Sequence, residues 1–127
     1  IYRGLVGSEM CIRDRFYGIL SNGGSRDGKT IMSRESINQA LTPHTSGPDT
    51  VLFFGDIKFG LGYLLNTQLS PIGRSEGAFG HAGIGGACAY GDIDKKIGFS
   101  YINNKIHKGL KLYQSSNELS DILYKLI

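Results

Sequence analysis

The chain has 127 residues, of which 40% are hydrophobic and 20% are charged, and its formal net charge at pH 7 is +3. This length suits one domain with a single core, and the weak, interspersed charge argues against a nucleic-acid partner. No apolar run approaches the ~20 residues needed to span a bilayer, so no membrane span is expected. The two cysteines, Cys11 and Cys88, are too few for a disulfide framework and lack zinc-ligand spacing, so no metal site is expected either.

The first fifteen residues fit poorly with the rest of the chain. They show neither the alternation of a strand, nor a helical stripe, nor the shape of a signal peptide. Residues 5–14 resemble one reading frame of a transposon-type sequencing adapter. We therefore expect residues 1–15 to be an artefact outside the fold, with residues 1–14 packing against nothing specific, and residues 16–127 to be the C-terminal part of one domain. The alternative is a genuine disordered tail.

Two helices are expected in the first third of the remaining chain. The first should end near Leu20, because an apolar cluster at helical spacing precedes Asn22-Gly23-Gly24, which can adopt positive φ. After a loop at residues 25–28 and an extended segment at 29–32, Ser33 can cap a second helix. The apolar residues that share a face of that helix are Ile37, Ala40 and Leu41. Residues 42–49, with two prolines and a glycine, are expected to form a loop.

Strands follow. Residues 51–54 and 58–65 suit strands with bends at Gly55, Gly60 and Gly62. Residues 86–90 and 98–103 should pair as an antiparallel hairpin whose turn lies near residues 92–96. Tyr63, Phe99 and Tyr101 are most simply core or sheet-face residues.

A helix should end the chain. Ser115 and Glu118 can form a capping box at its start. The residues that form its one apolar face are Leu119, Ile122, Leu123 and Leu126. The expected fold class is therefore α/β of the segregated, α+β kind, an antiparallel sheet with flanking helices.

The sharpest chemical feature is a glycine-dense run around one imidazole, Phe79-Gly80-His81-Ala82-Gly83-Ile84-Gly85-Gly86. Glycines there would let a ligand approach the backbone closely. His81 could also be an ordinary loop histidine bonded to backbone, and the run could be a phosphate loop, although no Lys-Ser/Thr follows it. Cys88 reads as a small buried residue, and His44 and His107 read as surface residues.

With its flanks, this run resembles the end of the serine β-lactamase and penicillin-binding protein superfamily, especially its family VIII esterase-like members. The resemblance rests on the glycine turn at 21–24, the capped helix at Ser33, Gly60-Leu61-Gly62-Tyr63, and His81-Ala82-Gly83 in place of the family's third motif. It covers about four-fifths of the chain. It implies a partial β-lactamase/transpeptidase-like fold whose helical domain lies largely outside this chain.

The resemblance also implies roles for individual residues. His81 would be the third-motif donor or cation, the backbone N–H of Ile84 would serve an oxyanion hole, and Gly83 would leave room for the acyl group. Ala82 and Gly85 would line the substrate site. The family's Ser-x-x-Lys nucleophile motif is absent from the chain, since Ser33 and Ser115 both lack the lysine three residues later.

The resemblance therefore implies part of a serine hydrolase that forms an acyl-enzyme on a small-molecule ester or on a β-lactam-like or peptide-like substrate, without a cofactor. This chain alone is expected to be inactive. Histidine carries less fixed positive charge at neutral pH than the family's lysine, which favours esters over carboxylate-bearing β-lactams. The rival interpretation is a non-catalytic penicillin-binding-like relative that kept the pocket for ligand binding or regulation.

Overall fold

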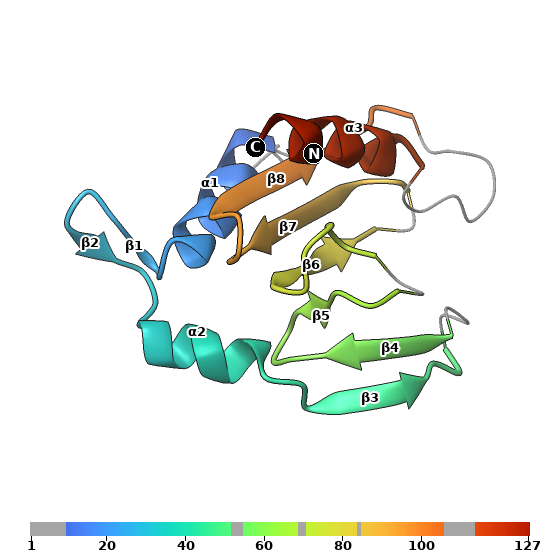
Figure 1. Ribbon diagram of the computed structural model, residues 1–127, viewed down its shortest axis with the longest axis horizontal. Coiled ribbons are helices and arrows are strands. Elements are labelled where there is room, and N and C mark those ends of the chain that lie inside the picture. Colours follow the sequence, from blue (N-terminus) through green and yellow to red (C-terminus); the bar gives the residue numbers. More distant parts are fainter. Residues whose placement is uncertain (1–9, 52–54, 69–70, 84, 106–113) are drawn as a thin grey trace, which may run out of the picture.

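The computed structural model describes residues 10–51, 55–68, 71–83, 85–105 and 114–127. The helices in these ranges are α1 (Met10–Ser21), α2 (Arg34–Leu41) and α3 (Gln114–Leu126) (Figure 1). A two-stranded ribbon of β1 (Ser25–Arg26) and β2 (Lys29–Thr30) connects α1 to α2. The main antiparallel sheet has the order of its chain: β3 (Thr45–Pro48), β4 (Asp56–Phe59), β5 (Leu64–Leu65), β6 (Ala78–Ala82), β7 (Cys88–Asp92) and β8 (Ile97–Tyr101). The expected α+β class, an antiparallel sheet with flanking helices, is confirmed.

Helices cover both faces of this sheet, because successive side chains along a strand point to opposite sides. On one face, Tyr124 of α3 packs with the buried cluster Ile57, Leu64, Ile72, Ala78, Cys88 and Tyr90. On the other face, Tyr17 of α1 and Leu41 of α2 pack with Leu20, Ile37, Leu65 and Phe79. None of the described helices is both long and apolar enough to cross a bilayer.

Helix α1 ends as its sequence predicts. The N–H of Gly24 donates to the carbonyl of Ile19 at 2.8 Å and that of Gly23 to Leu20 at 3.1 Å, which is the Schellman arrangement. Gly23 takes φ +88°, a conformation that glycine adopts without steric cost.

The start of α1 differs from the expectation. The helix begins at Met10, so residues 10–15 are helical, because each added residue extends the intrahelical hydrogen-bond ladder. The side chain of Ile12 is 51% exposed. The expectation of no specific contact is wrong at Asp14, whose carbonyl oxygen lies against Gly98. Leu5 and Val6 lie outside the described residues, and the adapter origin of residues 1–15 stays a prediction.

Helix α2 is capped as predicted. The Ser33 hydroxyl accepts from the Ser36 N–H at 3.1 Å, and Ile37 and Ala40 are buried. The ribbon before α2 was not predicted, although its signal was present. Asp27 (φ +51°) and Gly28 (φ +74°) form the two-residue turn that Asp-Gly favours between paired strands.

Two predictions between α2 and β5 are wrong. The expected loop at residues 42–49 contains β3, which pairs with β4 through Thr45↔Phe59 and Pro48↔Asp56. Proline is tolerated there because β3 is at the edge of the sheet and its outer side needs no donor. The expected bent strand at 58–65 is two strands, since residues 60–63 turn between β4 and β5. Within the strand predicted at 51–54, Val51 lies in a turn, and residues 52–54 lie outside the described part.

The Gly60 turn is held by helix α2. The Leu61 N–H donates to the carbonyl of Ala40 at 2.8 Å, and a methyl group built on Gly60 would lie only 2.0 Å from that same oxygen. A residue with a side chain at position 60 would therefore push the turn away from α2. This close approach, rather than strand formation, explains the glycine.

The predicted hairpin of β7 and β8 is confirmed. Its register runs from Cys88↔Tyr101 to Asp92↔Ile97, and residues 93–96 form the turn. Gly91 and Gly98 are partners across the two strands.

Helix α3 packs with a different face from the one predicted. It begins at Gln114, one residue before Ser115, which was the expected cap. The side chain of Ser115 lies outside the described part of the structure. Leu119 (44%), Ile122 (56%) and Leu126 (78%) are exposed, whereas Ser116 and Ser120 are buried. Polar partners satisfy the hydroxyls on this buried face, as the Tyr90 hydroxyl does for Ser120.

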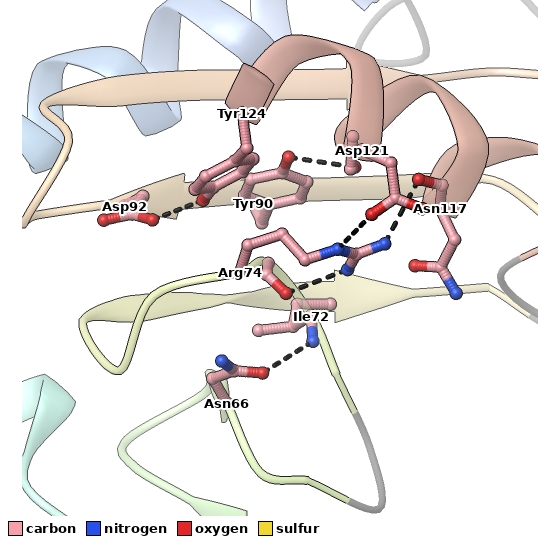
Figure 2. A network of polar contacts seen from close by, with 10 residues as sticks. Asn66, Ile72, Arg74, Tyr90, Asp92, Asn117, Asp121 and Tyr124 are labelled. Carbon is pink, nitrogen blue, oxygen red and sulfur yellow. Dashed lines mark hydrogen bonds and ion pairs between the residues drawn. The ribbon is translucent and has the colours of Figure 1, made fainter. Parts of the chain in front are cut away.

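Polar contacts hold α3 against the sheet (Figure 2). The Tyr90 hydroxyl donates to Ser120 at 2.9 Å, and the Tyr124 hydroxyl donates to the carboxylate of Asp92. Arg74, on the segment before β6, donates from Nε to Asp121 at 2.7 Å and from Nη2 to the carbonyl of Asn117 at 3.1 Å. This ion pair lowers the pKa of Asp121.

Candidate active site

His81 lies on β6, an interior strand of the main sheet. Gly80 pairs with Leu64 on β5 and with Tyr90 on β7, and His81 pairs with Ala89. Phe79 and Gly80 are buried, but the His81 side chain is exposed. A central strand therefore carries the imidazole out of the core at its C-terminal end.

The geometry around His81 determines which ring nitrogen carries the proton. Nδ1 lies 2.7 Å from the carbonyl oxygen of Ala82, which can only accept, so Nδ1–H is the donor. Nε2 forms no hydrogen bond with the described residues. The ring of Phe59 lies beside the imidazole, with centroids 6.1 Å apart. The imidazole is thus oriented by its own strand and presents Nε2 for another contact.

The loop after β6 is tightly closed. The Gly83 N–H donates to the carbonyl of Ala87 at 2.7 Å, and the Gly86 N–H donates to Gly83 at 2.9 Å. The Asn103 side chain donates to the Gly85 carbonyl at 2.6 Å. Ile84, the expected oxyanion donor, lies outside the described residues.

Asn103 was missed from the sequence as a residue that positions this loop. It ends the segment predicted to pair with the strand that follows the loop. Hairpin register alone places the end of that segment beside the start of its partner, so the position was recoverable. The hydrogen bond from Asn103 to Gly85 could not be predicted, because amide side chains have many possible partners.

The two glycines that flank His81 and Ala82 differ in the space that a side chain would have at each position. A methyl built on Gly80 would lie 2.2 Å from the Ala89 carbonyl oxygen, so packing between β6 and β7 requires this glycine. At Gly83 a methyl would meet only the Ala87 oxygen, at 3.8 Å, which is an ordinary contact. The described fold does not itself require glycine at position 83.

An aromatic cluster lies behind His81 on the α1 side of the sheet. The rings of Tyr17 and Tyr63 pack on Phe79 with centroid distances of 5.8 and 5.3 Å. Burial raises the pKa of Tyr17 to about 12 and also raises that of Tyr63. Both phenols are therefore neutral at physiological pH and serve as core residues, as predicted for Tyr63.

The other candidate residues lie elsewhere. Cys88 is buried, and burial raises its pKa to about 12, which agrees with a structural thiol. His44 is exposed and contacts the Gln39 carbonyl at 3.1 Å, whereas His107 lies outside the described part. The described residues contain no cluster of histidine, cysteine and carboxylate side chains suited to a metal ion.

Known proteins resemble this chain over only part of their length. No protein-family profile matches it. It is 34% identical over 94 residues to the esterase/beta-lactamase LipL of Mycobacterium tuberculosis, an alignment that covers 72% of this chain and 20% of that protein. The chain thus spans about a fifth of the length of this curated relative.

Two solved structures share the fold. A penicillin-binding protein homologue from Caulobacter crescentus has a TM-score of 0.70 at 33% identity, over 76% of this chain and 26% of that one. A family VIII carboxylesterase has a TM-score of 0.79 at 26% identity, over 87% of this chain and 30% of that one. In sequence and fold, this chain is therefore similar to part of the β-lactamase-related, penicillin-binding-protein-like esterases and β-lactamases.

Proposed function

We propose that this chain is the C-terminal part, residues 16–127, of a serine hydrolase, and that it supplies the His81-Ala82-Gly83 side of the active site. The observation that carries this proposal is the placement of His81: a central strand holds it exposed, Nδ1–H donates to the carbonyl of Ala82, and Nε2 forms no hydrogen bond with a described residue. The similarity to a carboxylesterase and to an esterase/beta-lactamase supports acyl transfer as the chemistry.

The nucleophile comes from elsewhere in a longer polypeptide. No serine in the 127 residues is followed three positions later by lysine, and the chain spans only a fifth to a third of the relatives' length. In the proposed reaction a serine hydroxyl attacks the ester carbonyl, and a nearby base takes its proton. The C–O bond to the alcohol breaks, the alcohol leaves with a proton, and water then hydrolyses the acyl-enzyme.

His81 acts on the substrate through Nε2. A neutral ring accepts a hydrogen bond from a hydroxyl at this nitrogen, and a protonated ring donates one. The N–H of Ile84 would donate to the oxyanion, and such a donor is worth about 3 kcal/mol in an unrelated serine hydrolase. The open space at Gly83 supports clearance for the acyl group beside that donor, lined by Ala82 and Gly85. With histidine rather than a fixed cation, the site favours uncharged esters over carboxylate-bearing β-lactams.

A hybrid enzyme tests this proposal. In the family VIII carboxylesterase, the segment that this chain matches would be replaced by residues 16–127, so that the host supplies the serine. We expect the hybrid to hydrolyse 4-nitrophenyl butyrate and to show a covalent acyl-enzyme by mass spectrometry under single-turnover conditions. The isolated chain serves as the negative control.

The outcomes separate the two interpretations of the family resemblance. Turnover by the isolated chain would contradict the assignment of the nucleophile to other sequence. A hybrid that folds, as judged by circular dichroism, and binds a β-lactam or ester without turnover would favour the non-catalytic binding relative.

A further inference from the structure

A hollow lies at the other end of the sheet from His81. It has a volume of about 390 Å³ and is enclosed by the C-terminal turn of α1, one side of α2 and the turn between β7 and β8. Its apolar wall is formed by Leu20, Ile37 and Ile93. Leu20 and Ile37 are nearly fully buried, which makes that wall continuous with the core.

Two cations line this hollow without a partner of opposite charge. Arg34 and Lys96 both face it, and no carboxylate is among its lining residues. Within the described ranges neither side chain forms an ion pair, whereas Arg26 and Arg74 do. A methyl built on Gly23 would lie 2.9 Å from Nη2 of Arg34, which places the guanidinium directly over the glycine turn.

The backbone places Lys96 at the edge of the same hollow. Lys96 takes φ +57°, a conformation that favours glycine or asparagine over lysine. Its carbonyl accepts from the Asn22 side chain at 3.0 Å, which ties the β7–β8 turn to the end of α1. The α1 carbonyls at this end accept bonds from Asn22, Gly23 and Gly24, and an anion here would need Arg34 and Lys96 to offset the partial negative charge of the helix end.

A second hollow adjoins the first at Ile93, which lines both. It has a volume of about 240 Å³, and its apolar lining includes Leu41, Leu65, Ala78 and Phe79, while Lys58, Asn66 and Glu76 also line it. A ligand that satisfied both hollows would need an anionic head and an aliphatic tail. A bare phosphate or sulfate would use the cations and leave the second hollow unfilled.

We propose that Arg34 and Lys96 form a binding site for an amphipathic monocarboxylate, such as a medium-chain fatty acid, with the carboxylate between the two cations and the tail crossing Ile93. Arg34 supplies planar donors and Lys96 a point charge. The site is separate from His81, so it does not depend on the hydrolase proposal.

Isothermal titration of the 127-residue chain with sodium decanoate below its micelle concentration tests the site. We expect saturable one-to-one binding, weaker by about three- to fourfold for each methylene removed toward butyrate, since a buried methylene contributes about 0.8 kcal/mol. Decanol and sodium sulfate are expected to bind at least about tenfold more weakly than decanoate. Equal binding of decanol would remove the cation site, and equal binding of sulfate would remove the tail site.

Variants make the test specific. Arg34→Gln and Lys96→Gly should each raise the Kd of decanoate about tenfold, the loss typical of one charge-assisted hydrogen bond. Lys96→Gly also relieves the positive φ, so weaker binding there cannot come from unfolding. Lys95→Gln, one residue away and outside the lining, is the matched control and should leave the Kd unchanged. Absence of saturable binding, or unchanged affinity in both site variants, would overturn the proposal.

Discussion

Gly18 of α1 and Gly98 of β8 face each other across one contact, but only Gly18 has room for a side chain. A methyl built on Gly98 would lie 2.2 Å from both the Gly18 nitrogen and the Asp14 carbonyl oxygen. A methyl built on Gly18 would come no closer than 3.8 Å to Gly98. The asymmetry arises because the strand side chain would point into the helix backbone, whereas the helix side chain would pass beside the strand.

The two alanine substitutions should therefore have opposite effects. Gly98→Ala must push α1 off the sheet and is expected to lower the free energy of unfolding by about 2 kcal/mol or more. Gly18→Ala should leave it unchanged or raise it by up to about 1 kcal/mol, because alanine favours helices over glycine. Urea denaturation of both variants measures this, and equal destabilisation would contradict the packing of α1 on β8.

The hydrogen bond from Tyr124 to Asp92 is expected to be the strongest single attachment of α3. Asp92 is fully buried, and its other oxygen accepts from the Lys95 N–H at 3.0 Å. Tyr124→Phe removes one donor from this buried carboxyl group and should cost about 1–3 kcal/mol. Tyr101→Phe is the matched control, since its hydroxyl has no bond to a described residue, and should cost within about 0.5 kcal/mol. Similar losses in both would rule out a special role for the Asp92 contact.

The thiol of Cys88 should be inert in the folded protein. Burial raises its pKa from 9.0 to about 12, so the reactive thiolate is scarce at pH 8. In a Cys11→Ser background, iodoacetamide should label Cys88 at least about 10²-fold more slowly in buffer than in urea, as read by mass spectrometry. Rapid native labelling would show that β7 is accessible.

Alkaline pH should destabilise the fold. Burial raises the pKa of Tyr90 from 10.0 to about 12, and it raises the pKa of Tyr17 by the same amount. The folded state therefore holds these protons more tightly than the unfolded state, so the stabilisation is complete below pH 10 and is lost between pH 10 and 12. Urea titrations at pH 8, 10 and 11 should show this decline, and Tyr90→Phe should make it shallower. A stability that rises over this interval would contradict the burial of these phenols.

Sequence patterns predicted the elements whose signals are local. The Schellman end of α1, the Ser33 cap and the β7–β8 hairpin each depend on residues within a few positions of one another. Such signals act through backbone conformation and nearby hydrogen bonds, so tertiary context seldom overrides them. The glycines around His81 singled it out as a candidate in the same way, and its role stays a prediction.

The wrong predictions concern elements whose structure depends on tertiary packing. Ser116 and Ser120 are buried on α3 although leucines were available, and the Tyr90 hydroxyl bonds Ser120. The strand at Thr45 depends on a partner, β4, about ten residues away, and overrides the local loop signal of its glycine and proline. The hollow lined by Arg34 and Lys96 was not predicted either. These residues are 62 positions apart in the chain, so only the folded structure brings them to the same hollow.

The role of His81 is tested most directly by kcat/KM for 4-nitrophenyl butyrate in the hybrid carboxylesterase, with and without His81→Ala. His44→Ala is the matched control, since His44 is an exposed histidine outside the site. We predict that His81→Ala lowers kcat/KM by about 10²-fold with an unchanged free energy of unfolding, and that His44→Ala has no effect. An unchanged kcat/KM in the His81 variant of an active hybrid would contradict the active-site assignment.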